Sequence, residues 1–186
     1  MGGALVLAAA LTQLIENGSS ALLRKSRIAI ALFMVGLVMS GATAIPVEWE
    51  LRLLLRLCHA VAGPDAGQSS ELVAWIERVY NALHITNAQY PFIGYGFDWL
   101  AFGHFCIALV FVGPLRDPVK NIWVLKFGMI CCALVVPYAF LFGTLRGIPL
   151  YWRLIDCGFG VIGFPIIWYA HRCAAWLETP SLPANP

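Results

Sequence analysis

The chain has 186 residues, and its 12 Lys and Arg residues against 10 Asp and Glu give a formal net charge of +2. Apolar residues make up 60% and charged residues 12%, whereas soluble domains are about half apolar and about a quarter charged. This composition excludes a disordered chain, and the absence of basic clusters argues against nucleic-acid binding. We therefore expect an integral membrane protein.

Four segments are long and apolar enough to cross a hydrocarbon core of about 30 Å. They are residues 28–45, 92–113, 122–143 and 149–170. Pro137 and Pro165 fall inside the third and fourth segments, where each removes one backbone hydrogen bond and predicts a kink.

Residues 46–91 are too polar to span, and their periodicity predicts two amphipathic helices. Leu51, Leu55 and Cys58 lie on one stripe of the first helix. Ser69 or Ser70 is placed to cap the second. The predicted fold class is all-α, an integral membrane four-helix bundle with two extramembrane amphipathic helices between spans 1 and 2.

The ends of the chain are predicted from the same patterns. Residues 1–27 are expected to form a short N-terminal helix with a basic flank, separate from the first span. Residues 171–186 are expected to form a polar tail because they are rich in Pro and polar side chains.

The distribution of Lys and Arg predicts the orientation, since basic residues favour the cytoplasmic side. One side carries seven: Arg24, Lys25, Arg27, Arg116, Lys120, Lys126 and Arg172. The other side carries five, accompanied by several glutamates: Arg52, Arg56, Arg78, Arg146 and Arg153. We therefore expect both termini, residues 1–27 and 171–186, in the cytoplasm and residues 46–91 outside.

Ionisable side chains at membrane depth are costly unless they are paired or hydrated, so each is a candidate for a functional role. Five of them fall in the predicted outer half: Asp98, His104, Arg146, Arg153 and Asp156. Arg153 and Asp156 are three residues apart on one helix and are expected to pair. Two interpretations stay open: a structural network between spans two and four, or an outward cavity for a ligand, ion or proton.

Small residues predict where helices approach closely. Gly158, Gly160 and Gly163 follow Asp156 and are expected to let span four pack tightly against a neighbour.

No cofactor is expected. The six cysteines lack the spacing of a zinc site, because adjacent helical residues such as Cys131 and Cys132 point about 100° apart. A haem held by two histidines is not expected either, since His104 lies in the predicted outer half and His171 at the inner end.

No motif in the chain fixes a reaction. The sequence favours a non-enzymatic accessory or scaffold subunit, or a subunit that binds a small ligand. The alternative is a small membrane enzyme or a proton-coupled carrier that uses His104 and Asp156. The expected partners are the lipid bilayer and either another membrane protein or a second copy of this chain.

Overall fold

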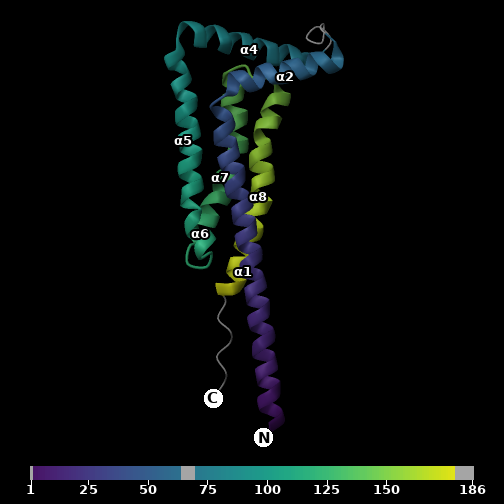
Figure 1. Cartoon of the computed structure of the whole chain (residues 1–186), viewed down its shortest axis with the longest axis vertical. Coiled ribbons are helices and arrows are strands. Elements are labelled where there is room, and N and C mark those ends of the chain that lie inside the picture. The colour runs from purple at the N-terminus through teal and green to yellow at the C-terminus, as the bar shows by residue number, and fades with distance from the viewer. Residues whose placement is uncertain (1, 64–69, 179–186) are drawn as a thin grey trace. The chain divides into compact units, whose positions relative to one another are not determined.

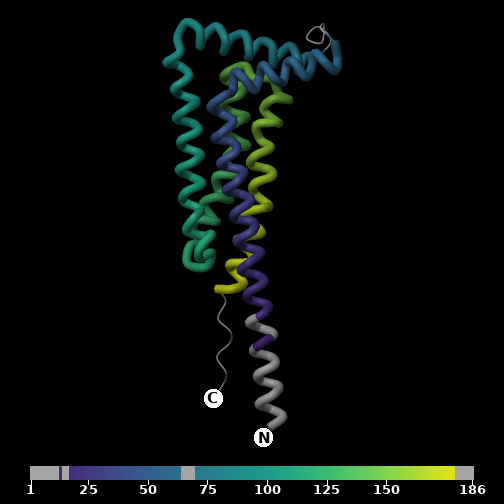
Figure 2. Tube along the Cα trace, viewed as in Figure 1, coloured from purple at the N-terminus to yellow at the C-terminus, as the bar shows by residue number. Residues whose placement is uncertain are grey.

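The structure is a computed structural model that describes residues 2–63 and 70–178, although the side chains of residues 2–12 and 14–16 are outside the description (Figure 2). The described residues form helices and no strand. In chain order these are α1 (Gly2–Ala44), α2 (Val47–Ala62), α4 (Glu71–Gln89), the 3-10 helix η1 (Pro91–Gly94), α5 (Tyr95–Val110), α6 (Val112–Arg116), α7 (Ile122–Leu145) and α8 (Leu150–Glu178) (Figure 1).

Four helical stretches are long and apolar enough to cross a membrane: Asn17–Ala44, Pro91–Arg116, Ile122–Leu145 and Leu150–Glu178. At most 28% of each apolar window is buried inside the protein. Because most of these apolar side chains have no protein cover, they suit contact with lipid. The predicted all-α class, with two helices α2 and α4 between the first and second spans, is confirmed, and the chain is a multi-pass membrane protein.

The prediction of a separate short N-terminal helix is wrong. The α1 helix runs without interruption from Gly2 to Ala44, so the basic residues at 24–27 lie within a helix rather than in a linker. The stretch contains no proline, and lysine and arginine are good helix formers. At the other end, α8 continues to Glu178, beyond the predicted end of the span at residue 170. Of the predicted tail, residues 179–186 lie outside the described residues.

The chain divides into two compact units, which we describe separately. The first comprises residues 1–36 and 108–186, and the second comprises residues 37–107.

In the first unit, α7 packs along α8, and glycines permit the contact (Figure 1). A Cβ atom added at Gly160 would lie 2.5 Å from the Cys132 carbonyl oxygen, and one added at Gly163 would lie 3.1 Å from the Cys132 sulfur. Gly158 has nothing within 4 Å of such an atom. The predicted close approach is therefore confirmed at Gly160 and Gly163 and is wrong at Gly158.

In the second unit, α2 and α4 pack together through their apolar faces (Figure 1). Leu51 and Leu55 of α2 and Val73 and Ile76 of α4 are buried. The Ser70 side chain accepts a hydrogen bond from the Val73 backbone N–H at 3.5 Å, which confirms the predicted N-cap. Capping residues of this kind satisfy backbone donors that the first helical turn leaves unpaired.

Candidate functional site

Asp98 and His104, two of the predicted site residues, belong to the second unit. Asp98 lies in the first turn of α5. His104 lies six residues later, and its Nδ1–H donates to the carbonyl oxygen of Leu100 at 2.8 Å. The α1 backbone at Gly41 lies close to His104 of α5, since a Cβ atom added at Gly41 would lie 2.9 Å from the His104 Cβ. In the described residues the His104 ring is therefore engaged by its own helix and not by Asp98.

Arg146, Arg153 and Asp156 belong to the first unit. Arg146 and Asp156 line the same cavity, of about 480 Å³, between α7 and α8. Arg153 instead donates through Nη1 to the Thr144 hydroxyl at 2.6 Å. Its guanidinium also lies 5.9 Å from the centre of the Phe140 ring.

The predicted pair between Arg153 and Asp156 is not formed. No ion pair of the described residues includes either side chain. Thr144 provides the oxygen that Arg153 uses, because the end of α7 lies beside the first turns of α8. The grouping of all five predicted residues in one polar cluster stays a prediction, since Asp98 and His104 belong to a different unit from the other three.

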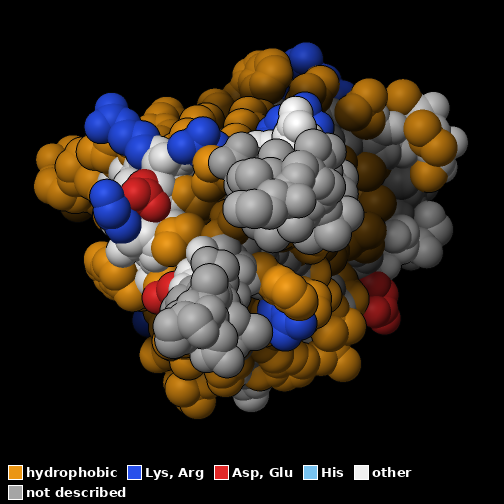
Figure 3. All heavy atoms as spheres, turned by 90° about the horizontal axis from the view of Figure 1, so that it is seen from below, with side chains coloured by type: hydrophobic (Ala, Val, Ile, Leu, Met, Phe, Trp, Pro, Cys, Tyr) orange, Lys and Arg blue, Asp and Glu red, His pale blue; other side chains and the backbone are white. Residues whose placement is uncertain are grey.

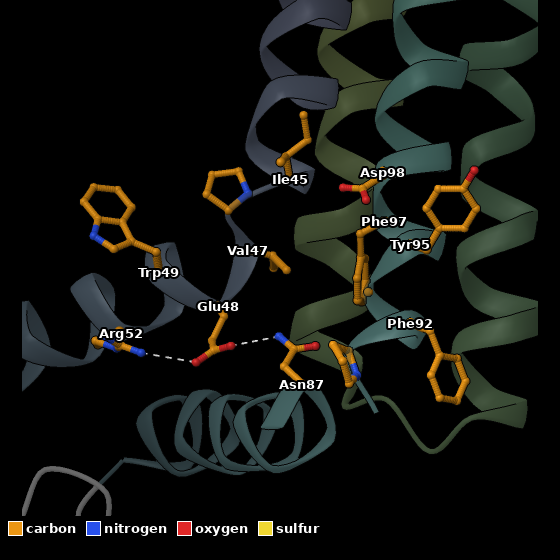
Figure 4. Close-up of a pocket in the computed structure, with 13 residues that line it drawn as sticks. Ile45, Val47, Glu48, Trp49, Arg52, Asn87, Phe92, Tyr95, Phe97 and Asp98 are labelled. Carbon is orange, nitrogen blue, oxygen red and sulfur yellow. Dashed lines mark hydrogen bonds and ion pairs between the residues drawn. The ribbon is translucent and has the colours of Figure 1, made fainter. Parts of the chain in front are cut away.

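The largest cavity that we describe lies wholly in the second unit and has a volume of about 790 Å³. It is formed where α1 ends, α2 begins, α4 ends and α5 begins (Figure 4). Because α2 and α4 connect two consecutive spans, this cavity lies where spans 1 and 2 reach the membrane surface. Its polar lining residues are Glu48, Arg52, Asn87 and Asp98, and its aromatic ones are Trp49, Phe92, Tyr95 and Phe97.

Glu48 is the centre of a hydrogen-bond network on one wall of this cavity (Figure 4). Its Oε1 accepts from His84 Nδ1 at 2.8 Å and from Arg52 Nη2 at 3.2 Å, and its Oε2 accepts from Asn87 Nδ2 at 2.8 Å. The hydrogen bond from Asn87, followed by that from His84, lowers the pKa of the Glu48 carboxyl below its ordinary value. Glu48 is thus ionised, fixed in position and shared between α2 and α4.

Arg52 is committed to the same network. Its Nε donates to the Tyr80 hydroxyl at 3.2 Å, and its guanidinium lies 5.9 Å from the Tyr80 ring centre. Farther along the two helices, His59 of α2 contacts Glu77 of α4 at 2.9 Å. Two histidine–carboxylate contacts therefore join α2 to α4 and hold the wall of the cavity in place.

Asp98 lies on another wall of the cavity, and its carboxylate enters from α5 (Figure 4). It makes no ion pair or hydrogen bond with any residue in the described part of the chain. The charged lining side chains are two carboxylates, Glu48 and Asp98, and one guanidinium, Arg52. The cavity therefore carries a formal charge of −1, and Asp98 is the carboxylate that is free to meet a ligand.

Sequence reasoning selected Asp98 but missed Glu48 and Asn87. A signal was present, since Glu48 and Arg52 are four residues apart on α2, and His84 and Asn87 are three apart on α4. Such spacings place side chains on one helix face. What the sequence lacked was the register of α2 against α4, which brings the two faces together.

Among the described residues, no group of three or more His, Cys, Asp and Glu side chains could hold a metal ion. Comparison of the chain with protein-family models, curated proteins and solved structures finds no match. The geometry of the cavity is therefore the basis for a functional proposal.

Proposed function

We propose that this protein is an accessory or ligand-binding membrane subunit that holds a small amphiphile with a cationic headgroup in the cavity between α2, α4 and α5. The observation that carries the proposal is the unpaired Asp98 carboxylate on the wall of a cavity of about 790 Å³ at the ends of two spans. Ligand pockets in proteins commonly have volumes of about 300 to 1,000 Å³ and few polar groups.

Charge favours a cation over an anion. Glu48 already accepts hydrogen bonds from three side chains, and Arg52 is engaged by Glu48 and Tyr80. An anionic headgroup would meet Asp98 without a free guanidinium to balance it. A cationic headgroup would find in Asp98 a carboxylate with no competing partner.

The aromatic lining supports the same ligand class. Trp49 is 60% exposed, Phe92 72% and Tyr95 60%, so their ring surfaces are accessible. A cation over such a ring is stabilised by roughly 0.5 to 1 kcal/mol at an exposed site. The rings also offer apolar surface to a short alkyl chain, as an amphiphile at the membrane surface requires.

The ligand class can be tested by calorimetry on the protein in lipid nanodiscs. The probes are hexyltrimethylammonium and hexanesulfonate, which have the same chain and opposite charges. We expect the cation to bind more tightly than the anion. Asp98→Asn should weaken cation binding by about threefold to fivefold, as expected for a partly exposed ion pair. Asp117→Asn, the same change in a residue outside the cavity, should leave cation affinity unchanged.

Two results would overturn this function: equal binding of the two probes, or a loss of cation affinity that is the same for Asp98→Asn and Asp117→Asn. Either result would mean that the probes partition into the disc or respond to the overall charge of the protein.

We propose further that both termini lie in the cytoplasm, so that this cavity opens on the outer side. The basic residues at 24–27 support this orientation. Asn81 is an exposed residue of α4, and Lys120 lies in the loop before α7. On intact cells, a membrane-impermeant maleimide should label the Asn81→Cys variant above the level of the parent and should not label Lys120→Cys. Labelling at position 120 alone would reverse the orientation without affecting the ligand proposal.

A further inference from the structure

A second, independent feature lies in the first unit, where a groove runs along α1 and α8. It has a volume of about 430 Å³ and is lined by Lys25, Ile28, Ala29, Leu32, Pro165, Ile166 and Tyr169. All of these side chains except Lys25 and the Tyr169 hydroxyl are apolar. The groove is thus hydrophobic along its length and carries one positive charge.

The groove has a defined direction. Lys25 and Leu32 are seven residues apart, which corresponds to about 10 Å along α1. Ser26, the neighbour of Lys25, is fully buried and donates through its hydroxyl to the Ala170 carbonyl oxygen at 3.1 Å. This bond places Lys25 at the level of Tyr169, while Leu32 lies deeper in the apolar span. The charge is therefore at the end nearer the membrane surface.

A small side chain, Ala29, forms the base of the groove. Ala29 is only 8% exposed. In contrast, Ile28 is 61% exposed and Leu32 57%, so these two side chains form the exposed edge of the groove. A groove of this form fits a linear hydrocarbon chain better than a flat helix surface does.

The charged end of the groove lies in a basic neighbourhood. Arg24 and Arg27 flank Lys25, and Arg27 Nη2 donates to the Arg116 carbonyl oxygen at 2.6 Å. Neither Lys25 nor Arg24 forms an ion pair with a residue in the described part of the chain. On the face seen in Figure 3, Lys and Arg side chains, together with a few Asp and Glu side chains, lie among hydrophobic ones. This pattern offers positive charge next to apolar surface.

From these features we infer that the groove is a binding site for an anionic phospholipid. One acyl chain lies along Ile28, Leu32 and Pro165, and the phosphate lies beside the Lys25 ammonium. Basic side chains near a membrane surface each strengthen binding of acidic lipids by about 1 kcal/mol, or about fivefold in affinity. The site is separate from the cavity at Asp98 and does not depend on its ligand.

The test is native mass spectrometry of the intact protein titrated with dioleoyl phosphatidylglycerol and dioleoyl phosphatidylcholine, which share their acyl chains. We expect the first phosphatidylglycerol to bind more tightly than the first phosphatidylcholine. Lys25→Gln should weaken phosphatidylglycerol binding by about fivefold. It should weaken phosphatidylcholine binding much less, because the choline cation of that lipid offsets the negative charge of its phosphate.

The matched control is Lys120→Gln, because Lys120 is 85% exposed in a loop on the same side of the spans and also loses one positive charge. Its effect on phosphatidylglycerol should be much smaller than that of Lys25→Gln. A second variant, Ile28→Trp, places a larger side chain at the edge of the groove and should weaken both lipids. Equal losses for Lys25→Gln and Lys120→Gln would show general charge attraction and would overturn the site. Equal affinities of the two lipids for the parent, or an Ile28→Trp protein that binds both as the parent does, would also overturn it.

Discussion

Substitution of Gly160 offers a direct test of how α7 packs against α8. In Gly160→Ala the new methyl group would lie 2.5 Å from the Cys132 carbonyl oxygen and 3.0 Å from Val135 Cβ. Carbon–oxygen contacts ordinarily begin at about 3.3 Å, so the two backbones must separate by roughly 0.8 Å. Because the obstacle is backbone rather than a flexible side-chain end, no rotamer change relieves it. Overpacking of this kind costs about 1 to 3 kcal/mol.

Gly158→Ala is the matched control, since it makes the same chemical change two residues away on the same helix. Nothing lies within 4 Å of a Cβ atom at Gly158. Replacing glycine by alanine inside a helix favours the helix by up to about 1 kcal/mol, so this variant should be as stable as the parent or more so. The difference between the two variants therefore isolates the steric contact from helix propensity.

Thermal unfolding in dodecyl maltoside, followed by circular dichroism, measures both variants under one condition. We expect a lower melting temperature for Gly160→Ala and an unchanged or higher one for Gly158→Ala. If both variants had the same melting temperature, α7 and α8 would not be in backbone contact at Gly160, and this packing of the two helices would be incorrect.

Three further predictions follow from single interactions. The pKa of Glu48 is lowered in the folded protein, so the stability that Glu48 contributes is present above the ordinary value of 4.5 and is lost as pH falls through the folded pKa. The protection of α2 and α4 from hydrogen exchange should therefore decrease as the pH is lowered through this range. Glu48→Gln should make that protection less dependent on pH. Thr144→Val should destabilise by at most about 0.5 to 1.5 kcal/mol in thermal unfolding because it removes the acceptor of an exposed Arg153 hydrogen bond, and Thr144→Ser should restore the parent value. Ser26→Ala should cost about 0.5 to 1.5 kcal/mol, whereas Ser20→Ala, at an exposed hydroxyl, should cost little in the same assay.

The helical framework could be predicted because local rules determine it. A spanning segment must pair its own backbone groups in lipid, so about 20 apolar residues already indicate a helix. The third span shows this well, since the prediction of 122–143 differs from α7 only in that the helix continues to Leu145. The cap at Ser70 was predictable for the same reason, because a serine before an apolar periodic segment acts within one turn.

The single long α1 helix was not predicted, because a change of composition was interpreted as a change of structure. The basic residues 24–27 separate two apolar stretches, but charge alone does not end a helix. A helix ends where a proline, a left-handed residue or a competing cap interrupts it. Pro46 follows the end of α1 at Ala44, and no proline precedes it in the chain.

The interactions of the polar side chains could not be predicted, because each has several partners within reach and tertiary packing selects among them. Asp156 was the nearest acceptor for Arg153 along the sequence, yet Arg153 donates to Thr144, nine residues earlier on another helix. A hydroxyl that already donates to the Phe140 carbonyl at 2.6 Å is held in position to accept from the guanidinium. The partner of Arg153 therefore depends on where α7 ends relative to α8. The spacing of residues within α8 gives no information about that position.

Tertiary packing also determines that Asp98 has no partner within the described part of the chain. Most charged groups around its cavity satisfy one another through the register of α2 and α4: Glu48 takes hydrogen bonds from Arg52, His84 and Asn87. Asp98 comes from α5 and is left out of that network. Asp98 is exposed, so its carboxylate is open to water and to any ligand that enters the cavity. Because exposed aromatic rings line the same cavity, a cationic amphiphile can contact both the carboxylate and the rings.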